Sequence, residues 1–361
     1  MKLRSLLGLA ASILILLTGC KEPDGSSSGT SGAALYAYDS TTSAIFVWTD
    51  ISAVYSSTAA TVAPTKQITS SVFSSKLSTL AWGGVCLDSL HGYLYLVSET
   101  GSIVRVSNLR SQSGSVASNE VVSFSLSDSG RLTSSTFGQV ALDAQNDQLY
   151  ITENGSSSTQ IWVVSNASSR QQSESITLQA LHMAGDTGGT GVAAASGSVY
   201  AFLLNGDTVG NIVTYTGPRL RKGTASAFTD ASTLIGPATL IGKYGSMALD
   251  TGNGYLFVAR HNTDAGATTA PIQVFTTGAF GQSFNQAPTA QLGSTTAQPD
   301  LRVLTHAGSK DWLAGLRGSG TVGYGTVYLW KSPMGGTAAK VVSVSPTTAV
   351  FRGLAIDGNA S

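Results

Sequence analysis

A six-residue motif recurs along this chain of 361 residues, and its spacing limits the possible folds more than any other feature. We call it the hexad, and its four clear copies are Gly83–Asp88, Gly138–Asp143, Gly245–Asp250 and Arg352–Asp357. The closing aspartates are separated by 55, 107 and 107 residues. Because 107 is two steps of about 53.5, the spacing indicates a repeat architecture with one small supersecondary unit per step.

Each clear hexad before the last is followed by a turn and by further β-rich runs. Asn, Asp and Gly in the turns, between β-branched and aromatic residues, are typical of hairpins. The second runs are 93–97, 148–152 and 255–259. The third runs are 103–106, 161–164 and 272–275, and the weaker fourth runs are 120–126, 175–178 and 289–292. Four short antiparallel strands in each repeat predict one β-propeller blade.

Two further units are degenerate copies of this pattern. The first begins at 191–195, which ends in alanine in place of aspartate, and continues with runs at 199–202 and 212–215. The second has no clear hexad. Its later strands are predicted at 311–316, 326–330 and 340–344.

The two ends of the chain carry complementary deficits. The last hexad has no hairpin partner, whereas 35–38 and 45–48 resemble second and third strands without a first strand. Joining them completes a blade and leaves no long unpaired edge. We therefore predict an all-β, six-bladed β-propeller of four-stranded antiparallel blades, closed by pairing the N- and C-terminal strands. A seven-bladed ring would need another unit inside the Ser/Thr-rich stretches, which leave little room for it.

The repeated pattern Gly-x-Ala-Leu-Asp, turn, Leu-Tyr-Val-x resembles the NHL-type and wider TolB-like six-bladed propellers over nearly all of residues 34–361. The resemblance implies the architecture and no single function, because this fold carries lyases, lactonases, receptors and passive scaffolds. Its lactonases and amidating lyases need a metal cluster in the central channel. None of the four histidines here has a partner at metal-ligand spacing, so we assign no metal ligand and expect no cofactor.

The first twenty residues resemble a bacterial lipoprotein signal. An apolar run over 6–17 is too short to span a bilayer and has the length of a signal-peptide core. The run ends in Leu-Thr-Gly-Cys at 17–20, which resembles the lipobox and implies that acyl chains such as palmitate anchor Cys20 in the lipid bilayer. In the lipoproteins that this signal resembles, aspartate after the cysteine favours the inner membrane, so the resemblance implies that Lys21 favours the outer membrane if the organism has one. The alternative is an ordinary secretory signal with an incidental cysteine.

Composition divides the chain into three predicted segments. Residues 1–19 are the signal peptide, 20–33 are the lipidated cysteine and a flexible Gly/Ser-rich tether, and 34–361 are the propeller domain. Charged residues make up 11% of the chain and the formal net charge is zero, so we expect no nucleic-acid partner. Cys86 stands in its hexad where alanine stands in the others, which predicts a small, buried apolar role and not a reactive thiol.

Two sets of residues map to the face of the ring where the inner strands begin. Aromatic residues precede the four hexads, either as a rim around a pocket or as packing between blades, and the repeat spacing alone favours packing: Trp82, Phe137, Tyr244 and Phe351. Charged residues end the second strands, as ligand-orienting groups or as solvated loop ends: Asp39, Glu99, Glu153, Arg260, His261 and Arg317. From these sets we select as candidate ligand-binding residues the four aromatics with Glu99, Glu153 and Arg260.

The hexad aspartates are predicted to hold turns by accepting backbone hydrogen bonds, and we assign no catalytic residue. The chain contains neither a Gly-x-Ser-x-Gly elbow nor a phosphate-binding loop. We expect a lipid-anchored, non-catalytic propeller that binds a protein, peptide or glycan in the cell envelope. The alternatives are a metal-dependent hydrolase or lyase of lactonase type with its site in the channel, and a structural subunit of an envelope complex.

The lipobox assignment predicts the fate of one thiol. Replacing Cys20 by serine is expected to abolish incorporation of labelled fatty acid, because the acyl chains are attached through that sulfur. Cys86→Ser is the matched control and should be labelled as the parent is. Labelling of Cys20→Ser would contradict the assignment.

Overall fold

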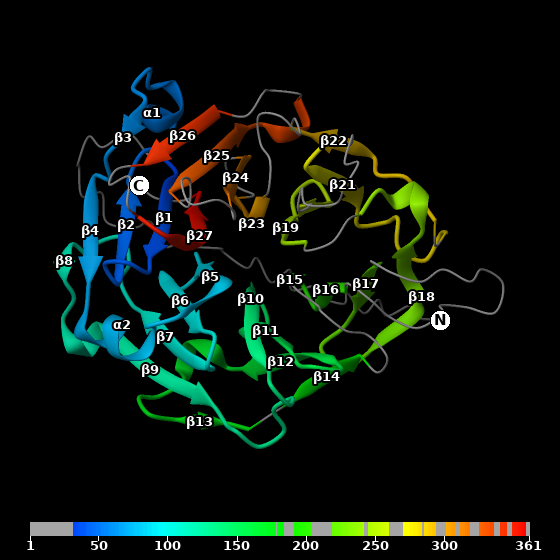
Figure 1. Ribbon diagram of the computed structural model, residues 1–361, viewed down its shortest axis with the longest axis horizontal. Helices are drawn as coiled ribbons and strands as arrows, with labels where there is room; N and C mark the ends of the chain where they lie inside the picture. Colours follow the sequence, from blue (N-terminus) through cyan, green and yellow to red (C-terminus); the bar gives the residue numbers. More distant parts are fainter. Residues whose placement is uncertain are drawn as a thin grey trace, which may run out of the picture. The chain divides into compact units, whose positions relative to one another are not determined.

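The four clear hexads lie in the innermost strands of four of six small, mainly antiparallel sheets, and the six sheets are arranged as the blades of a ring (Figure 1). A computed structural model describes residues 32–177, 179–183, 191–203, 219–241, 245–259, 270–283, 285–293, 301–307, 311–317, 325–335, 340–344 and 349–358. Residues 31–361 are one compact unit. The predicted six-bladed, all-β propeller is confirmed.

The blades are numbered along the chain, and each is given from its innermost strand outward. Blade 1 contains β27 (Phe351–Asp357), β1 (Ala34–Asp39), β2 (Ala44–Trp48) and β4 (Lys66–Thr69). Blade 2 contains β5 (Leu80–Asp88), β6 (Tyr93–Ser98), β7 (Ser102–Val106) and β9 (Val121–Leu126). Blade 3 contains β10 (Thr136–Asp143), β11 (Gln148–Asn154), β12 (Thr159–Ser165) and β14 (Ala180–Met183).

The other three blades follow the same order. Blade 4 contains β15 (Gly191–Ala195), β16 (Ser198–Leu203), β17 (Arg219–Gly223) and β18 (Phe228–Ile235). Blade 5 contains β19 (Met247–Asp250), β20 (Tyr255–Ala259), β21 (Ile272–Thr276) and β22 (Ala290–Leu292). Blade 6 contains β23 (Leu301–Ala307), β24 (Trp312–Arg317), β25 (Thr326–Lys331) and β26 (Lys340–Val344).

Blade 1 closes the ring as the sequence predicts. The C-terminal strand β27 pairs antiparallel with β1, from Ala34 opposite Asp357 to Tyr38 opposite Gly353. A register shift follows before Asp39 pairs with Phe351. The pairing supplies β1 with the inner neighbour that its own sequence lacks, so neither strand is left as an open edge.

Short parallel strands extend three blades beyond the four strands predicted for each. The strands β3 (Thr61–Val62), β8 (Gly114–Ser115) and β13 (Ser175–Ile176) add to β26, β4 and β9, respectively. Each added strand comes from the connection leading to the fourth strand of the following blade, so it joins neighbouring blades by backbone hydrogen bonds. The fourth strand predicted at 175–178 is therefore wrong: 175–176 pair with blade 2, and β14 takes the outer place in blade 3.

Two short helices lie in the connections of blades 1 and 2. The helix α1 (Ile51–Ser56) follows β2, and its first turn is capped by the Asp50 carboxylate, which accepts from the amides of Ser52 and Ala53. The helix α2 (Ser71–Lys76) is capped by Ser70. Among the described residues, no helix combines the length and the apolar character that crossing a membrane requires.

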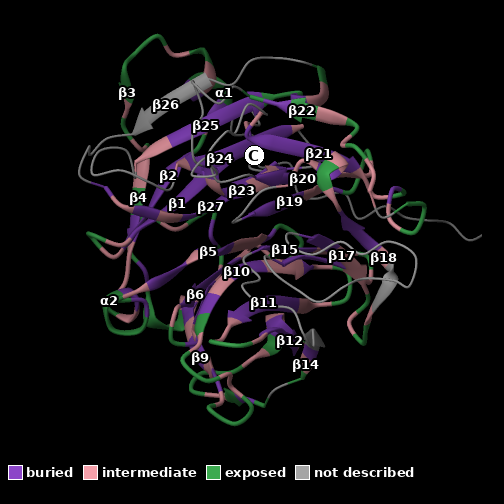
Figure 2. Ribbon diagram, turned by 45° about the vertical axis from the view of Figure 1, so that its right-hand side comes forward, coloured by how far each residue is buried: buried purple, intermediate pink, exposed green. Residues whose placement is uncertain are grey.

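The apolar cores lie between neighbouring blades. Alternate residues of each strand point to opposite faces, and the described residues form six buried clusters that each join two adjacent blades. Figure 2 shows burial along the strands, with exposed residues in the loops. The inner strand of blade 6, Leu301–Ala307, was not predicted from the sequence, because Arg302 stands in place of the opening glycine and Thr305 and His306 interrupt the apolar residues before the final alanine. The predicted run at 212–215 lies outside the described residues.

Candidate functional site

The inner strands give the ring two distinct faces. We call the side where they begin the mouth face, and the side of the turns that connect them to the second strands the hairpin face. Among the ligand-binding candidates selected from the sequence, those that the structure describes belong to the mouth face: Trp82, Phe137, Phe351, Glu99 and Glu153. The hexad aspartates end the inner strands at the hairpin face.

A single glutamine side chain crosses the central channel. Gln139 of β10 is 5% exposed, and its Nε2 donates to the carbonyl of Met247 at 2.7 Å. Its Oε1 accepts from the amides of Met247 at 3.1 Å and of Val192 at 3.3 Å. Gly83 lies against this side chain with φ +74°, and an added Cβ would be 3.1 Å from the Gln139 Cγ. Gln139 thus joins the inner strands of blades 3, 4 and 5 and fills the channel at their level.

A small cavity extends from Gln139 toward the hairpin face. It has a volume of about 150 Å³ and is lined by all six inner strands, including Val140, Leu142, Leu249 and Ile356. Sites for small organic ligands usually measure about 300–1,000 Å³. This cavity is therefore smaller than the sites that usually hold such a ligand.

The mouth face carries a cluster that we call the Trp82 site: Trp82, Glu99, Arg302 and Arg352. The indole of Trp82 is partly buried, and the guanidinium carbons of Arg302 and Arg352 lie over its ring at 5.3 and 5.5 Å from the centroid. Arg352 also donates to the carboxylate of Glu99 at 2.7 Å. Cations over an aromatic ring are attracted by its electron-rich face. The fold thus brings together two predicted residues and two arginines that the sequence analysis did not select.

The position of these arginines in the repeat is a signal that the sequence analysis missed. Arg352 occupies the first place of its hexad, where the other three clear copies have glycine. The strand pairing puts Arg302 at the same place in blade 6, because Ala307 faces Trp312 as Asp250 faces Tyr255. The adjacent blades 6 and 1 therefore each carry an arginine at the mouth face, at the position where the other three clear hexads have glycine.

The other aromatic candidates pack inside the ring or lie outside the described residues. Phe137 is 3% exposed in the core between blades 2 and 3, with its ring centroid 6.2 Å from that of Trp162. Phe351 is fully buried and meets Phe46 and Trp48 edge to face. The packing interpretation describes both rings, which offer no surface to a ligand. Tyr244 lies outside the described residues.

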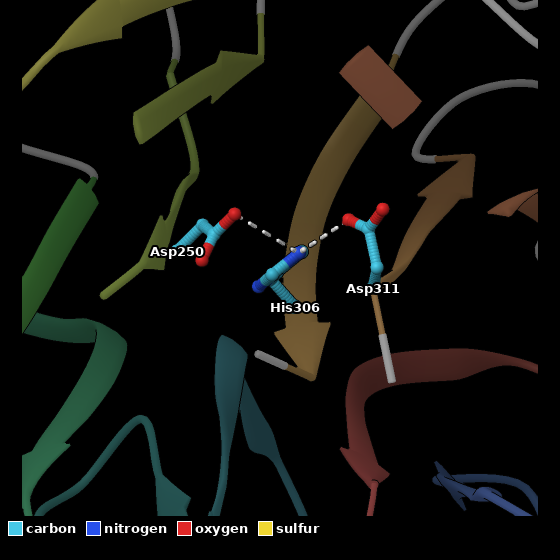
Figure 3. Close-up of side chains that lie close together, drawn as sticks. All are labelled: Asp250, His306 and Asp311. Atoms are coloured by element: carbon cyan, nitrogen blue, oxygen red, sulfur yellow. Dashed lines mark ion pairs between the residues drawn. The ribbon is translucent and has the colours of Figure 1, made fainter. Parts of the chain in front are cut away.

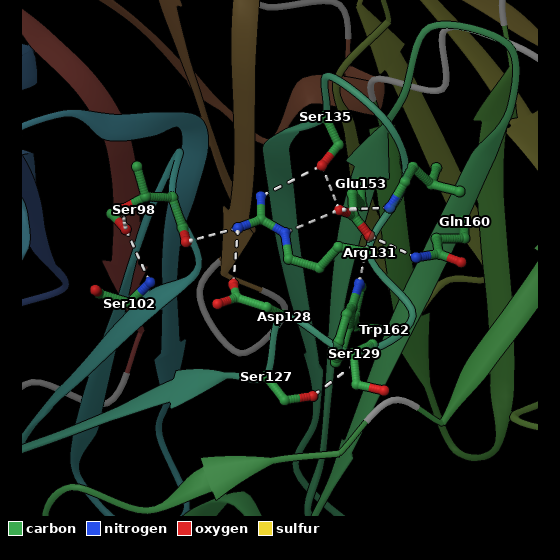
Figure 4. A network of polar contacts seen from close by, with 12 residues as sticks. Ser98, Ser102, Ser127, Asp128, Ser129, Arg131, Ser135, Glu153, Gln160 and Trp162 are labelled. Carbon is green, nitrogen blue, oxygen red and sulfur yellow. Dashed lines mark hydrogen bonds and ion pairs between the residues drawn. The ribbon is translucent and has the colours of Figure 1, made fainter.

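Glu153 is at the centre of a buried polar network in blade 3 (Figure 4). Its side chain is fully buried, and one carboxylate oxygen accepts from Ser135 Oγ at 2.5 Å and Arg131 Nε at 3.2 Å. The other accepts from Gln160 Nε2 at 2.5 Å and Trp162 Nε1 at 2.6 Å. Burial acts to raise the pKa of Glu153, but these hydrogen bonds outweigh it and hold the pKa below its usual range. With its oxygens occupied, Glu153 serves the fold and not a ligand.

Two of the remaining charged candidates, Asp39 and Arg317, lie in the described part of the chain. Asp39 is buried and accepts from the amides of Thr41, Thr42 and Val350, which fixes the loop next to β27. Arg317 ends β24 and is half-buried. Arg260 and His261 lie outside the described residues, as does Cys20.

The hexad aspartates hold turns at the hairpin face. Asp88 accepts from the amides of Leu90 and His91, and Asp250 accepts from those of Gly252 and Asn253, all at 3.0 to 3.1 Å. The predicted turn role is confirmed for these two. Asp357 differs, because its carboxylate accepts two hydrogen bonds from the guanidinium of Arg110 at 2.7 and 3.1 Å.

A histidine and two aspartates converge at the hairpin face between blades 5 and 6 (Figure 3). The Nε2 of His306 lies 3.9 Å from a carboxylate oxygen of Asp250 and 3.7 Å from one of Asp311. Burial lowers the pKa of His306, against the opposing effect of the Asp250 and Asp311 carboxylates. Sequence spacing did not reveal this group, because Asp250 belongs to a different repeat.

Cys86 lies beside the central cavity and packs against the core between blades 2 and 3. Burial, and then the charge of Asp88, raise the pKa of the thiol far above its ordinary value. Because the thiolate is the reactive form, this supports the predicted packing role.

Comparisons with known proteins support the fold. No protein-family model and no curated protein sequence matches the chain. A solved chain of a nidogen/laminin complex is similar, with a TM-score of 0.52 and 12% identity over 90% of this chain and 98% of that chain. A luciferin-regenerating enzyme aligns with a TM-score of 0.46 and 9% identity over 75% of this chain and 78% of that chain. At this identity, the first likeness shows a common fold alone.

The Glu153 network predicts a pH-dependent contribution to stability. Glu153→Gln should lower the free energy of unfolding at neutral pH by about 3 kcal/mol, because donors placed for a buried carboxylate lose it. A carboxyl whose native pKa is depressed stabilises above its unfolded pKa of about 4.3, and that contribution is lost as the pH falls through the native pKa. The difference in the free energy of unfolding between Glu153→Gln and the parent should therefore decrease at acidic pH.

Urea unfolding at neutral pH and at about pH 3 measures both effects. The matched control is Glu174→Gln, which removes the carboxylate of a more accessible pair with Arg170, with side chains 24% and 32% exposed, and should lower the free energy of unfolding much less. Equal stability of Glu153→Gln and the parent at neutral pH would contradict the assigned role.

Proposed function

We propose that this chain is a lipid-anchored lipoprotein of the cell envelope whose NHL-type or TolB-like propeller is a non-catalytic binding module. The lipobox at 17–20 and the Gly/Ser-rich tether support an anchor through acylated Cys20, and Lys21 supports the outer membrane. In this proposal the lipobox determines the localisation of the chain, and the mouth face is the surface that a partner contacts.

The Trp82 site is the observation that carries the binding proposal. Two guanidinium groups, on Arg302 and Arg352, meet there with one carboxylate, on Glu99, in a chain with few charged residues. Arginine forks suit carboxylates, and interfaces are enriched in tryptophan and arginine. The ring of Trp82 is already engaged by the two cations, which leaves it less suited to stacking on a sugar. The site therefore favours a protein partner that presents acidic side chains.

The dimensions of the channel also favour this function over the lactonase-like alternative. In that alternative, a substrate would enter the central channel and meet reacting groups on the inner strands. Here the side chain of Gln139 crosses the channel, and the cavity beside it has a volume of about 150 Å³. A protein bound across the mouth face needs no passage through the ring.

Site-specific photocrosslinking in native membranes tests the proposal. A photoreactive residue at Thr136, which is exposed at the mouth face, should form discrete adducts with an envelope protein, whereas one at Ser89 on the hairpin face should not. The adducts should disappear in the double variant Arg302→Ala/Arg352→Ala, because the acidic partner loses both cations. Raised salt should weaken them for the same reason.

Arg170→Ala is the matched control. Arg170 and Arg352 are both 24% exposed in their side chains, and each is paired with one glutamate. Removing Arg170 should leave the adducts unchanged if the Trp82 site is the contact. Adducts that survive the double variant, or that form equally from both faces, would contradict the proposal.

A further inference from the structure

The group of Asp250, His306 and Asp311 has a geometry that direct hydrogen bonding does not explain. The closest approaches of His306 Nε2 to the two carboxylates are 3.7 and 3.9 Å. Hydrogen bonds between nitrogen and oxygen fall at about 2.7–3.2 Å. Figure 3 shows His306 between the two aspartates, with a ring nitrogen directed toward both. The three groups thus surround a common point without contacting one another.

His306 is the unusual member of the group. Its side chain is 1% exposed, it stacks on Phe257 with ring centroids 5.3 Å apart, and neither ring nitrogen has a hydrogen-bond partner in the described structure. A buried polar group without a partner costs about 1–3 kcal/mol. The same face offers a contrast, because His91 Nδ1 lies 2.7 Å from Asp88 and forms an ordinary hydrogen bond. The position of His306 calls for a bonding partner that stands between it and the carboxylates.

The chemistry of the three groups identifies that partner as a cation. A neutral imidazole and two carboxylates carry two negative charges, and imidazole together with carboxylate oxygens suits a borderline ion such as Zn²⁺. Bonds of about 2.0–2.2 Å in a tetrahedron place neighbouring ligand atoms roughly 3.3–3.5 Å apart. The two His306 distances exceed this spacing by a few tenths of an ångström, and the three ligand atoms all lie within 4.8 Å of one another. Asp250 Oδ2 also accepts from Asn253 Nδ2 at 2.8 Å and retains a lone pair for a metal.

The ring supplies a reason for such an ion at this position. Hexad aspartates tie blades to their neighbours at the hairpin face elsewhere: Asp357 of blade 1 binds Arg110 of blade 2, and Asp143 of blade 3 accepts from the amide of Gly197 in blade 4 at 2.6 Å. Asp250 of blade 5 faces His306 of blade 6 across a gap of 3.9 Å. Among the described residues, the outer strands β14, β18 and β22 also lack the added parallel strand that β26, β4 and β9 receive.

We propose that Asp250, His306 and Asp311 bind one divalent transition-metal ion of the Zn²⁺ class, and that this ion joins blade 5 to blade 6. Three protein ligands leave a fourth position for water. The ion satisfies the buried imidazole, neutralises the two carboxylates, and crosslinks two hairpins that the backbone does not join there. Binding to the folded ring alone makes the ion a stabiliser by mass action.

The test uses the full chain, purified in detergent without a histidine tag and stripped with EDTA. Titration with ZnCl₂ alone should show one saturable site by calorimetry and raise the midpoint of thermal unfolding. Asp311→Asn should weaken Zn²⁺ binding at least about tenfold and remove the thermal shift. Asp311 is 40% exposed, so this variant keeps the fold even where His306→Gln, in the core, does not. CaCl₂ should not compete, because Ca²⁺ takes six to eight oxygen ligands.

His91→Gln is the matched control, since it removes a histidine beside a hexad aspartate on the same face. It should bind Zn²⁺ as the parent does. Absence of saturable Zn²⁺ binding in the parent, or unchanged affinity in Asp311→Asn, would overturn the proposal. The Trp82 site does not enter this experiment, so either result leaves the proposed binding function to its own test.

Discussion

The pairing of β27 with β1 is the interaction on which the rest of the ring depends. Each apolar core lies between two blades, so a blade is stable only when both its neighbours are in place. The closing pair joins strands that are more than 300 residues apart in the chain. It also positions Phe351 against Phe46 and Trp48 in the core between blades 6 and 1. The chain runs from each blade into the next, whereas the two ends of the chain are joined, within blade 1, by the backbone pairing of β27 with β1 and by buried surface.

The sequence predicts the architecture because the hexad combines two local requirements. Small and apolar residues allow the inner strands to approach closely, and the closing aspartate organises the turn that follows, as Asp88 and Asp250 do. Where both requirements are missing, the prediction fails: β23 carries Thr305 and His306 in place of small and apolar residues and ends in alanine, and it was not predicted. β15 also ends in alanine but keeps small and apolar residues, and it was predicted. The added strands β3, β8 and β13 are two residues long, and their parallel partners belong to another blade. No local pattern encodes such a pairing.

The repeat predicts some of the candidate functional residues, and others become apparent only in the folded ring. Trp82 and Glu99 could be placed at the mouth face from the repeat, whereas Arg302 and Arg352 become visible only as departures from its glycine position. The spacing that suggested a rim also describes packing residues, and Phe137 and Phe351 belong to the cores. Asp250, His306 and Asp311 meet because the ring brings two blades together. The arginines at the mouth face would bind a partner, and a metal ion at the hairpin face would stabilise the ring, so the two faces would have separate roles.

Equilibrium unfolding of a chain that ends at residue 350 tests ring closure most directly. Deleting 351–361 removes β27 and leaves β1 as an unpaired edge of blade 1. The truncated chain should therefore lose its cooperative unfolding transition or become insoluble. Deleting only 358–361 leaves β27 complete and is the matched control, which should unfold like the parent. A chain without 351–361 that melts with the parent's midpoint and cooperativity would contradict the closure on which this account rests.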